Sequence, residues 1–167
     1  MTHPIRTDRL TLRAFQAQDL APYAAHYTGP RAAGTGAAMP PHVVVERFCA
    51  MIGHWTLRGF GRYAICLDPA APGIGHVGPM QLGDDAPEMT WTLWSADHEG
   101  QGFATEAARA VLDHLFTSGW SDILAHVEAA NTASHAVARR LGGQPTDAPP
   151  APWMPTGIQY RFTPEAP

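Results

Sequence analysis

The sequence predicts one α/β domain, more narrowly α+β, in which a mixed, mostly antiparallel central sheet of six or seven strands is flanked by about four helices. Segments that alternate apolar and polar residues recur along the chain, and turn signals join them, as in antiparallel strands. Other segments carry apolar residues at helical spacing. No repeat or linker interrupts the chain, so residues 1–167 are expected to form one domain.

The amino-terminal third predicts one strand and two helices. Residues 7–14 (TDRLTLRA) alternate leucine with arginine and threonine, which indicates a strand with one wet face. A helix is expected from about residue 18 to 27, before a Gly-Pro pair. Residues 29–41 are rich in glycine, alanine and proline without periodicity, which predicts a mobile loop. Apolar residues at helical spacing then predict a second helix over 44–59.

The middle of the chain predicts an antiparallel meander of three strands. The expected strands are 61–67, 75–82 and 88–95, each with β-branched or aromatic residues. The segments that join them, 68–73 and 83–85, contain the Gly, Pro and Asp residues typical of turns. Neighbouring strands joined by such short turns are expected to pair antiparallel.

The carboxyl-terminal third predicts a crossover and a last strand. A helix over 103–118 is followed by a strand over 122–128, an order that implies a parallel pair with a right-handed connection. A second helix is expected over 131–141, closed by two glycines. Residues 144–156 are proline-rich and predict a loop, and 157–163 (GIQYRFT) predict a final strand.

Composition excludes several functional classes. Of 167 residues, 45% are hydrophobic, and the net charge is -4, so no global field would attract nucleic acid. No apolar run approaches the roughly 18 residues that span a bilayer, so no membrane association is expected. Cys49 and Cys66 form no C-x-x-C pair and are expected to be reduced, buried thiols in a cytoplasmic protein. The histidines are scattered, which predicts no metal site.

A glycine-rich turn stands between a predicted strand and a predicted helix. Gly100 and Gly102 lack a Cβ and allow the backbone to approach a ligand closely. The helix that follows would direct unpaired N–H groups and the positive end of its dipole at one point, which suits a phosphate. Taken alone, this pattern is equally typical of a tight connection without a ligand.

Two segments together resemble a known family. EGQGFATEA at 99–107 and NTASHAVARRLGG at 131–143 are similar to the two signature segments of the GNAT acyl-CoA N-acyltransferase superfamily, most closely its ribosomal-protein-alanine N-acetyltransferase branch. TDRLTLR near the start and QYRFT near the end support the likeness, which covers nearly the whole chain. The resemblance implies a GNAT-type fold and an acetyl-CoA-dependent N-acetyltransferase. The acceptor would be a peptide α-amine or a small amine, and the enzyme a monomer or homodimer.

The resemblance also assigns residues to the cofactor. The main-chain groups of Trp94 and Ser95 would pair with the pantetheine arm, and an N–H there would polarise the thioester carbonyl. Asn131 and Ser134 match positions that meet the same arm, although they also form an ordinary helix N-cap pattern. The diphosphate loop of the family falls on Gly100, Gln101, Gly102, Phe103, Ala104 and Thr105.

Three positions depart from the family pattern. Glu99 replaces the usual Arg or Gln, which places a carboxylate near a phosphate unless its side chain points away. The tyrosine that many members use to protonate the leaving thiolate falls on Ala138, so Ser134, water or no residue would take that role. Gly143 stands where phenylalanine is common.

Candidates for the general base are Glu88 and His76. Glu88 opens the predicted strand 88–95, at a position that resembles one used in the family, and His76 lies on the neighbouring strand. An imidazole titrates near neutral pH. Asp84, Asp85 and Asp97 would join Glu88 in giving this end of the sheet an acidic character that favours a cationic amine.

Two other functions remain open at this point. Because the family tyrosine is missing, the chain could be a non-catalytic acyl-CoA-binding or sensing domain. A generic phosphate-binding fold without coenzyme A is the second alternative.

Overall fold

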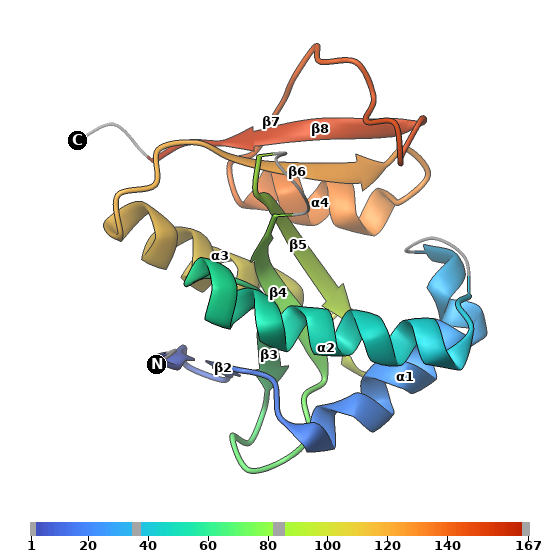
Figure 1. The fold of residues 1–167 in the computed structure, drawn as a ribbon. Helices are drawn as coiled ribbons and strands as arrows, with labels where there is room; N and C mark the ends of the chain where they lie inside the picture. The colour runs from blue at the N-terminus through green and yellow to red at the C-terminus, as the bar shows by residue number, and fades with distance from the viewer. Residues whose placement is uncertain (1–2, 35–37, 82–85, 165–167) are drawn as a thin grey trace.

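A computed structural model describes residues 3–34, 38–81 and 86–164 (Figure 1). Within these ranges one mixed sheet has the order β1-β2-β3-β4-β5-β6-β8-β7. Its strands are β1 (Ile5–Arg6), β2 (Thr11–Arg13), β3 (Tyr63–Cys66), β4 (Gly75–Met80), β5 (Glu88–Leu93), β6 (Ile123–Glu128), β7 (Gln144–Pro145) and β8 (Gly157–Phe162). The mostly antiparallel α/β class is confirmed.

The four predicted helices are confirmed with small shifts of their ends. The α-helices among the described residues are α1 (Leu20–Thr28), α2 (Pro41–Arg58), α3 (Phe103–Thr117) and α4 (Thr132–Arg140). Short 3₁₀ helices are η1 (Ala17–Asp19), η2 (Pro30–Gly34) and η3 (Ala96–His98). The α2 helix begins with a proline, whose fixed φ suits a first turn, and ends at Gly59 with φ 75°.

Three expectations need correction, and a fourth concerns residues that the structure does not describe. The sheet has eight described strands because Ile5–Arg6 pairs with the strand after it and Gln144–Pro145 pairs with β8. Part of the expected loop 29–41 is helical, as η2, and residues 35–37 lie outside the described residues. Cys49 is exposed on α2, whereas Cys66 is buried as expected. The turn 83–85, with Asp84 and Asp85, also lies outside the described residues.

Alternation along the strands builds two apolar clusters, one on each face of the sheet. On one face, Met89, Val77 and Ile123 pack against Val111 and Ala107 of α3. On the other face, Trp94 and Ala64 pack against aromatic residues of α1 and α2. Figure 1 shows α1 and α2 together in front of the sheet, with α3 behind it.

The sheet opens between β5 and β6. These two strands are parallel, as the crossover predicted, but they pair only at Glu88 with Leu124. In Figure 1, β6 and β8 run across the direction of β4 and β5. From residue 89 onward, the divergence leaves the β6-facing backbone groups of β5 without a strand partner in the described sheet, and the candidate functional site lies at this opening.

Candidate functional site

The turn between β5 and α3 directs a row of backbone N–H groups at one point. Gly100 and Gly102 have φ of 72° and 81°, in the left-handed region that favours glycine. The N–H of Glu106 donates to the carbonyl of Gly102 at 3.0 Å. Within the described chain, the N–H groups of residues 101–105 have no acceptor. Five such donors at a helix N-terminus fit the oxygens of a diphosphate.

The amino-terminal strands hold this loop in place. Arg9 donates from Nη1 to the carbonyl of Gln101 at 3.0 Å and from Nε to Oε2 of Glu106 at 2.7 Å. Its guanidinium carbon lies 4.6 Å from the ring centroid of Phe103. Thr7 donates to Oε1 of Glu106 at 2.6 Å. These contacts rigidify the loop before any ligand binds, which lowers the entropy cost of binding.

The carboxylate of Glu99 forms an ion pair with Arg31 of η2. This pairing partly neutralises the charge that replaces the family's Arg or Gln, and it turns the side chain toward η2. The ion pair also joins η2 to the loop. Both residues line a cavity of about 420 Å³, called here the loop groove, together with Leu93 of β5 and Asn131.

The backbone of β5 presents alternate groups toward the opening beside β6. The N–H of Trp94 is already used, because it donates to the carbonyl of Ile74 at 2.9 Å. Adjacent residues of a strand direct their backbone groups to opposite sides, so Leu93 and Trp91 face the opening. The N–H of Trp94 is therefore engaged within the sheet and does not face the opening.

A larger cavity of about 560 Å³, called here the interstrand cavity, lies beside the diverging strands. It shares three residues with the loop groove, namely Thr92, Glu128 and Asn131, so the two spaces meet there. Residues from α1, α2, β4 and α4 complete its wall. This arrangement allows one ligand to enter along the loop and a second to reach it from the other side.

The start of α4 closes one wall of both cavities. Oδ1 of Asn131 accepts a hydrogen bond from the N–H of Ser134 at 3.0 Å, which confirms the N-cap. Ser134 lines the interstrand cavity. Ala138 is fully buried and offers no proton donor, so the structure adds no replacement at that position.

Packing explains why residue 143 is a glycine. A Cβ at this residue would lie 2.6 Å from Cε1 of Phe162 and 2.8 Å from its Cζ. The ring of Phe162, from β8, thus fills the space that a side chain at residue 143 would need. Phe162 is buried and packs edge-on against Trp91, with the ring centroids 6.3 Å apart.

His76 lies in the wall of the interstrand cavity as a buried imidazole. Its Nδ1 accepts a hydrogen bond from Nε1–H of Trp94 at 3.1 Å. Burial, followed by the positive charges of Arg62, His26 and Arg47, lowers the pKa of His76 well below its ordinary value. The ring is therefore neutral at physiological pH, with one nitrogen occupied.

Glu88 meets a histidine from the neighbouring strand. Oε1 of Glu88 lies 2.7 Å from Nδ1 of His126, and the side chains are 23% and 6% exposed. The contact has the distance of an ion pair without the alignment of a hydrogen bond. His126 lines the interstrand cavity and also contacts Trp153, with the ring centroids 5.7 Å apart. The structure thus connects Glu88 to the cavity through His126.

Sequence reasoning missed several residues of the cavity wall. Arg47 of α2, Arg62 before β3, Tyr27 of α1 and His126 of β6 come from elements far apart in the chain. No local motif joins them. Alternation along 122–128 could have placed His126 on the face opposite the buried Ile123, which was the one available signal.

Neither a group of metal-binding side chains nor a helix that could span a membrane occurs among the described residues. In the parts of the chain that the structure describes, no three His, Cys, Asp or Glu side chains are grouped so that they could hold a metal ion. None of the helices in those same ranges combines the length and apolar character needed to cross a bilayer.

Comparison with known proteins identifies the family. The family model of the acetyltransferase (GNAT) domain matches residues 9–144. The chain belongs to this GNAT family. Its members are acetyltransferases, and acetyl-CoA is the donor. No curated protein matches the chain.

Solved GNAT structures share the fold over their full length. An acetyltransferase from Agrobacterium tumefaciens is 32% identical, with a TM-score of 0.88 and coverage of 98% of this chain and 96% of that one. The ribosomal-protein-S5-alanine acetyltransferase from Vibrio fischeri is 14% identical, with a TM-score of 0.75 and 98% coverage of both chains. RimL, the ribosomal L7/L12 α-N-protein acetyltransferase, was solved with coenzyme A; it is 17% identical, with a TM-score of 0.71 and coverage of 96% and 98%.

Proposed function

We propose that this GNAT domain transfers the acetyl group of acetyl-CoA to a primary amine by direct attack within a ternary complex. The observation that carries the proposal is the row of five open N–H donors at residues 101–105, beside the opening between β5 and β6. Acetyl-CoA, when bound, would supply an acetyl group that is activated as a thioester. Two cavities that meet at Thr92 and Asn131 can hold donor and acceptor at the same time.

The loop groove is proposed to bind the donor. The N–H groups of residues 101–105 bind the diphosphate, and Asn131 and Leu93 lie along the groove where the pantetheine arm would follow. Backbone groups of Trp91 and Leu93 face the opening and can pair with the amides of that arm. One of their N–H groups is also placed to stabilise negative charge on the carbonyl oxygen.

Glu88 is proposed as the general base, with His126 as the residue that positions it. A peptide α-amine has a pKa of about 7.7–8.0, so about a tenth is neutral at pH 7, whereas deprotonating a lysine costs about 4.6 kcal/mol. A carboxylate that acts through one water is sufficient for the first case. His76 is less suited to this role because its Nδ1 accepts from Trp94 and because burial, which lowers its pKa, disfavours the imidazolium that forms when a base takes up a proton.

Protonation of the leaving thiolate needs a donor in the interstrand cavity. Ser134, the residue that sequence analysis selected, lines this cavity, and so does the phenol of Tyr27. Burial raises the pKa of Tyr27, so its phenol keeps its proton at neutral pH and can donate it. Ser134→Ala and Tyr27→Phe separate the two candidates, since only the variant that removes the true donor lowers kcat.

Turnover against a panel of primary amines tests the proposed function. The assay measures release of free coenzyme A, and mass spectrometry detects an added acetyl group on the amine. A reaction without amine corrects for hydrolysis of acetyl-CoA. Amine-dependent release supports transfer, whereas tight binding of acetyl-CoA without release for any amine would favour the non-catalytic binding domain.

A further inference from the structure

Arg62 is a half-buried arginine whose charge has no ion-pair partner among the described residues. Its Nε is buried without a hydrogen-bond partner among the described residues, and no carboxylate there lies within ion-pair distance of its guanidinium. Burial is the largest cause that lowers the pKa of Arg62, and the neighbouring charge of Arg47 lowers it further. An unpaired cation that is partly buried is costly, and a bound anion would compensate for it.

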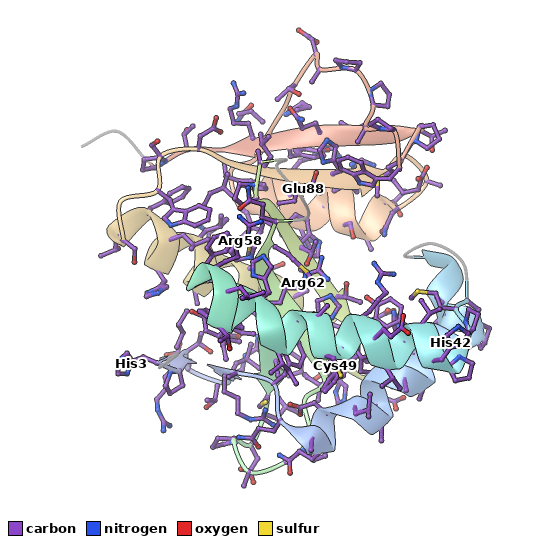
Figure 2. The ribbon with its side chains drawn as sticks, viewed as in Figure 1. His3, His42, Cys49, Arg58, Arg62 and Glu88 are labelled. Carbon is purple, nitrogen blue, oxygen red and sulfur yellow. The ribbon has the colours of Figure 1, made fainter. Side chains whose placement is uncertain are left out.

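The side chain of Arg62 belongs to the interstrand cavity. It lines this cavity together with Arg47, Tyr27 and His76, which come from α2, α1 and β4. In Figure 2, Arg62 lies between α2 and the strands β6 and β8, on the same side of the sheet as Glu88. Two arginines thus form one wall of the space proposed to receive the acceptor.

Acidic residues also lie at or beside this cavity. Glu128 of β6 lines the cavity, and Glu88 contacts His126, which also lines it. Glu88 opposes the effect of burial on the pKa of Arg62, which indicates that the two charges act on each other. The cavity therefore carries two arginines, from α2 and from the segment before β3, and an acidic residue from β6.

We infer that the acceptor is a small amine that carries a carboxylate, with its amine toward Glu88 and Glu128 and its carboxylate on Arg62 and Arg47. This inference rests on the proposed function, because it specifies the acceptor of the same transfer. A planar guanidinium binds a carboxylate through two parallel hydrogen bonds. The volume of about 560 Å³ is within the range of small-molecule sites.

Matched amines test the inference by turnover. The probes are ω-amino acids from glycine to 6-aminohexanoate, each compared with its carboxamide at saturating acetyl-CoA. The carboxamides have the lower amine pKa, so intrinsic reactivity opposes the expected result. For at least one chain length, kcat/KM is expected to be about tenfold or more higher for the carboxylate than for its carboxamide. We expect one bidentate contact between the carboxylate and a guanidinium to give a difference of this size. Equal values at every chain length would overturn the inference.

Variants connect this preference to Arg62. Arg62→Gln is expected to raise KM for the preferred carboxylate about tenfold, with kcat and the carboxamide values little changed. Arg58→Gln, an exposed arginine of the neighbouring α2, is the control and should keep the wild-type preference. Arg62→Gln is also expected to raise the melting temperature by about 2–4 °C, because it removes an uncompensated charge. A lower melting temperature would make Arg62 a structural residue and overturn the inference.

Binding without turnover distinguishes failure of this inference from failure of the proposed function. Calorimetry with the protein loaded with coenzyme A measures affinity for the same carboxylate and carboxamide pairs, and no reaction can occur. Carboxylate-selective binding that Arg62→Gln abolishes would support the anion site even if no amine is acetylated. Acetylation confined to peptides, with no selective binding of any small carboxylate, would overturn the inference while leaving acetyl transfer intact.

Discussion

Oε1 of Glu88 lies 2.7 Å from Nδ1 of His126, which stands two residues beyond Leu124, the residue of β6 that pairs with Glu88 in register. Immediately beyond this contact the strands diverge, and the interstrand cavity begins with Met89 and Thr90. A carboxylate and an imidazole are therefore held together at the edge of the space where an amine would lose its proton.

Glu88→Gln is expected to lower kcat more than about tenfold and to shift the pH–rate profile, because the amide cannot accept the proton of the amine. Steady-state kinetics from pH 6 to pH 9 measure both effects. Asp113→Asn, an exposed carboxylate on α3, serves as the control and should leave the profile unchanged. An unaltered profile for Glu88→Gln would remove this residue from the mechanism.

Gly102→Ala is expected to weaken binding of coenzyme A by about tenfold or more. A Cβ at φ 81° strains the backbone and displaces the N–H groups of the loop. Gly119→Ala is the matched control, because Gly119 has φ 92° and open space around it but lies far from the loop. Both variants should lose about 1–2 kcal/mol of stability. Equal affinities for coenzyme A would contradict the loop assignment, and calorimetry supplies the measurement.

Gly143→Ala is expected to lower the free energy of unfolding by about 1–3 kcal/mol, because the added methyl group overlaps the ring of Phe162. Phe162→Leu removes the two ring atoms that the methyl group would meet. In the double variant the cost of Gly143→Ala should therefore shrink, giving a coupling energy of about 0.5 kcal/mol or more. Strict additivity in urea unfolding would show that the two residues do not compete for one space.

Stability should fall as the pH drops below 6.5, the ordinary pKa of histidine. Because burial lowers the pKa of His76 in the folded state, the unfolded chain binds more protons in this range, and each such group costs at most about 1.4 kcal/mol per pH unit. His26, whose pKa burial also lowers, acts in the same direction.

His76→Asn should therefore flatten the dependence between pH 6.5 and pH 5, while its amide oxygen can still accept from Trp94. Chemical denaturation at each pH measures the slope. His42→Asn, at an exposed position of α2, is expected to retain the wild-type slope. If His76→Asn gave the same slope as the wild type, protonation of His76 would not account for the loss of stability in acid.

The sequence determined the fold class, the four helices and the glycine-rich loop that is proposed to bind the diphosphate. These features depend on local periodicity, on glycines at fixed spacing and on a helix that begins directly after a turn, all of which neighbouring residues encode. The two additional strands were missed because a two-residue strand such as Gln144–Pro145 carries no periodicity of its own. It exists only because β8 offers an edge to pair with.

Only the tertiary structure decided which side chains share the site. Arg62, Tyr27 and His126 converge from separate elements, and the same convergence places Phe162 in the space beside Gly143. It also decided that the N–H of Trp94 donates to the carbonyl of Ile74 and that the side chain of Glu99 turns toward Arg31. Such outcomes depend on which strands pair and where they part. That pairing joins residues distant in the chain, and the spacing of residues along the sequence does not specify it.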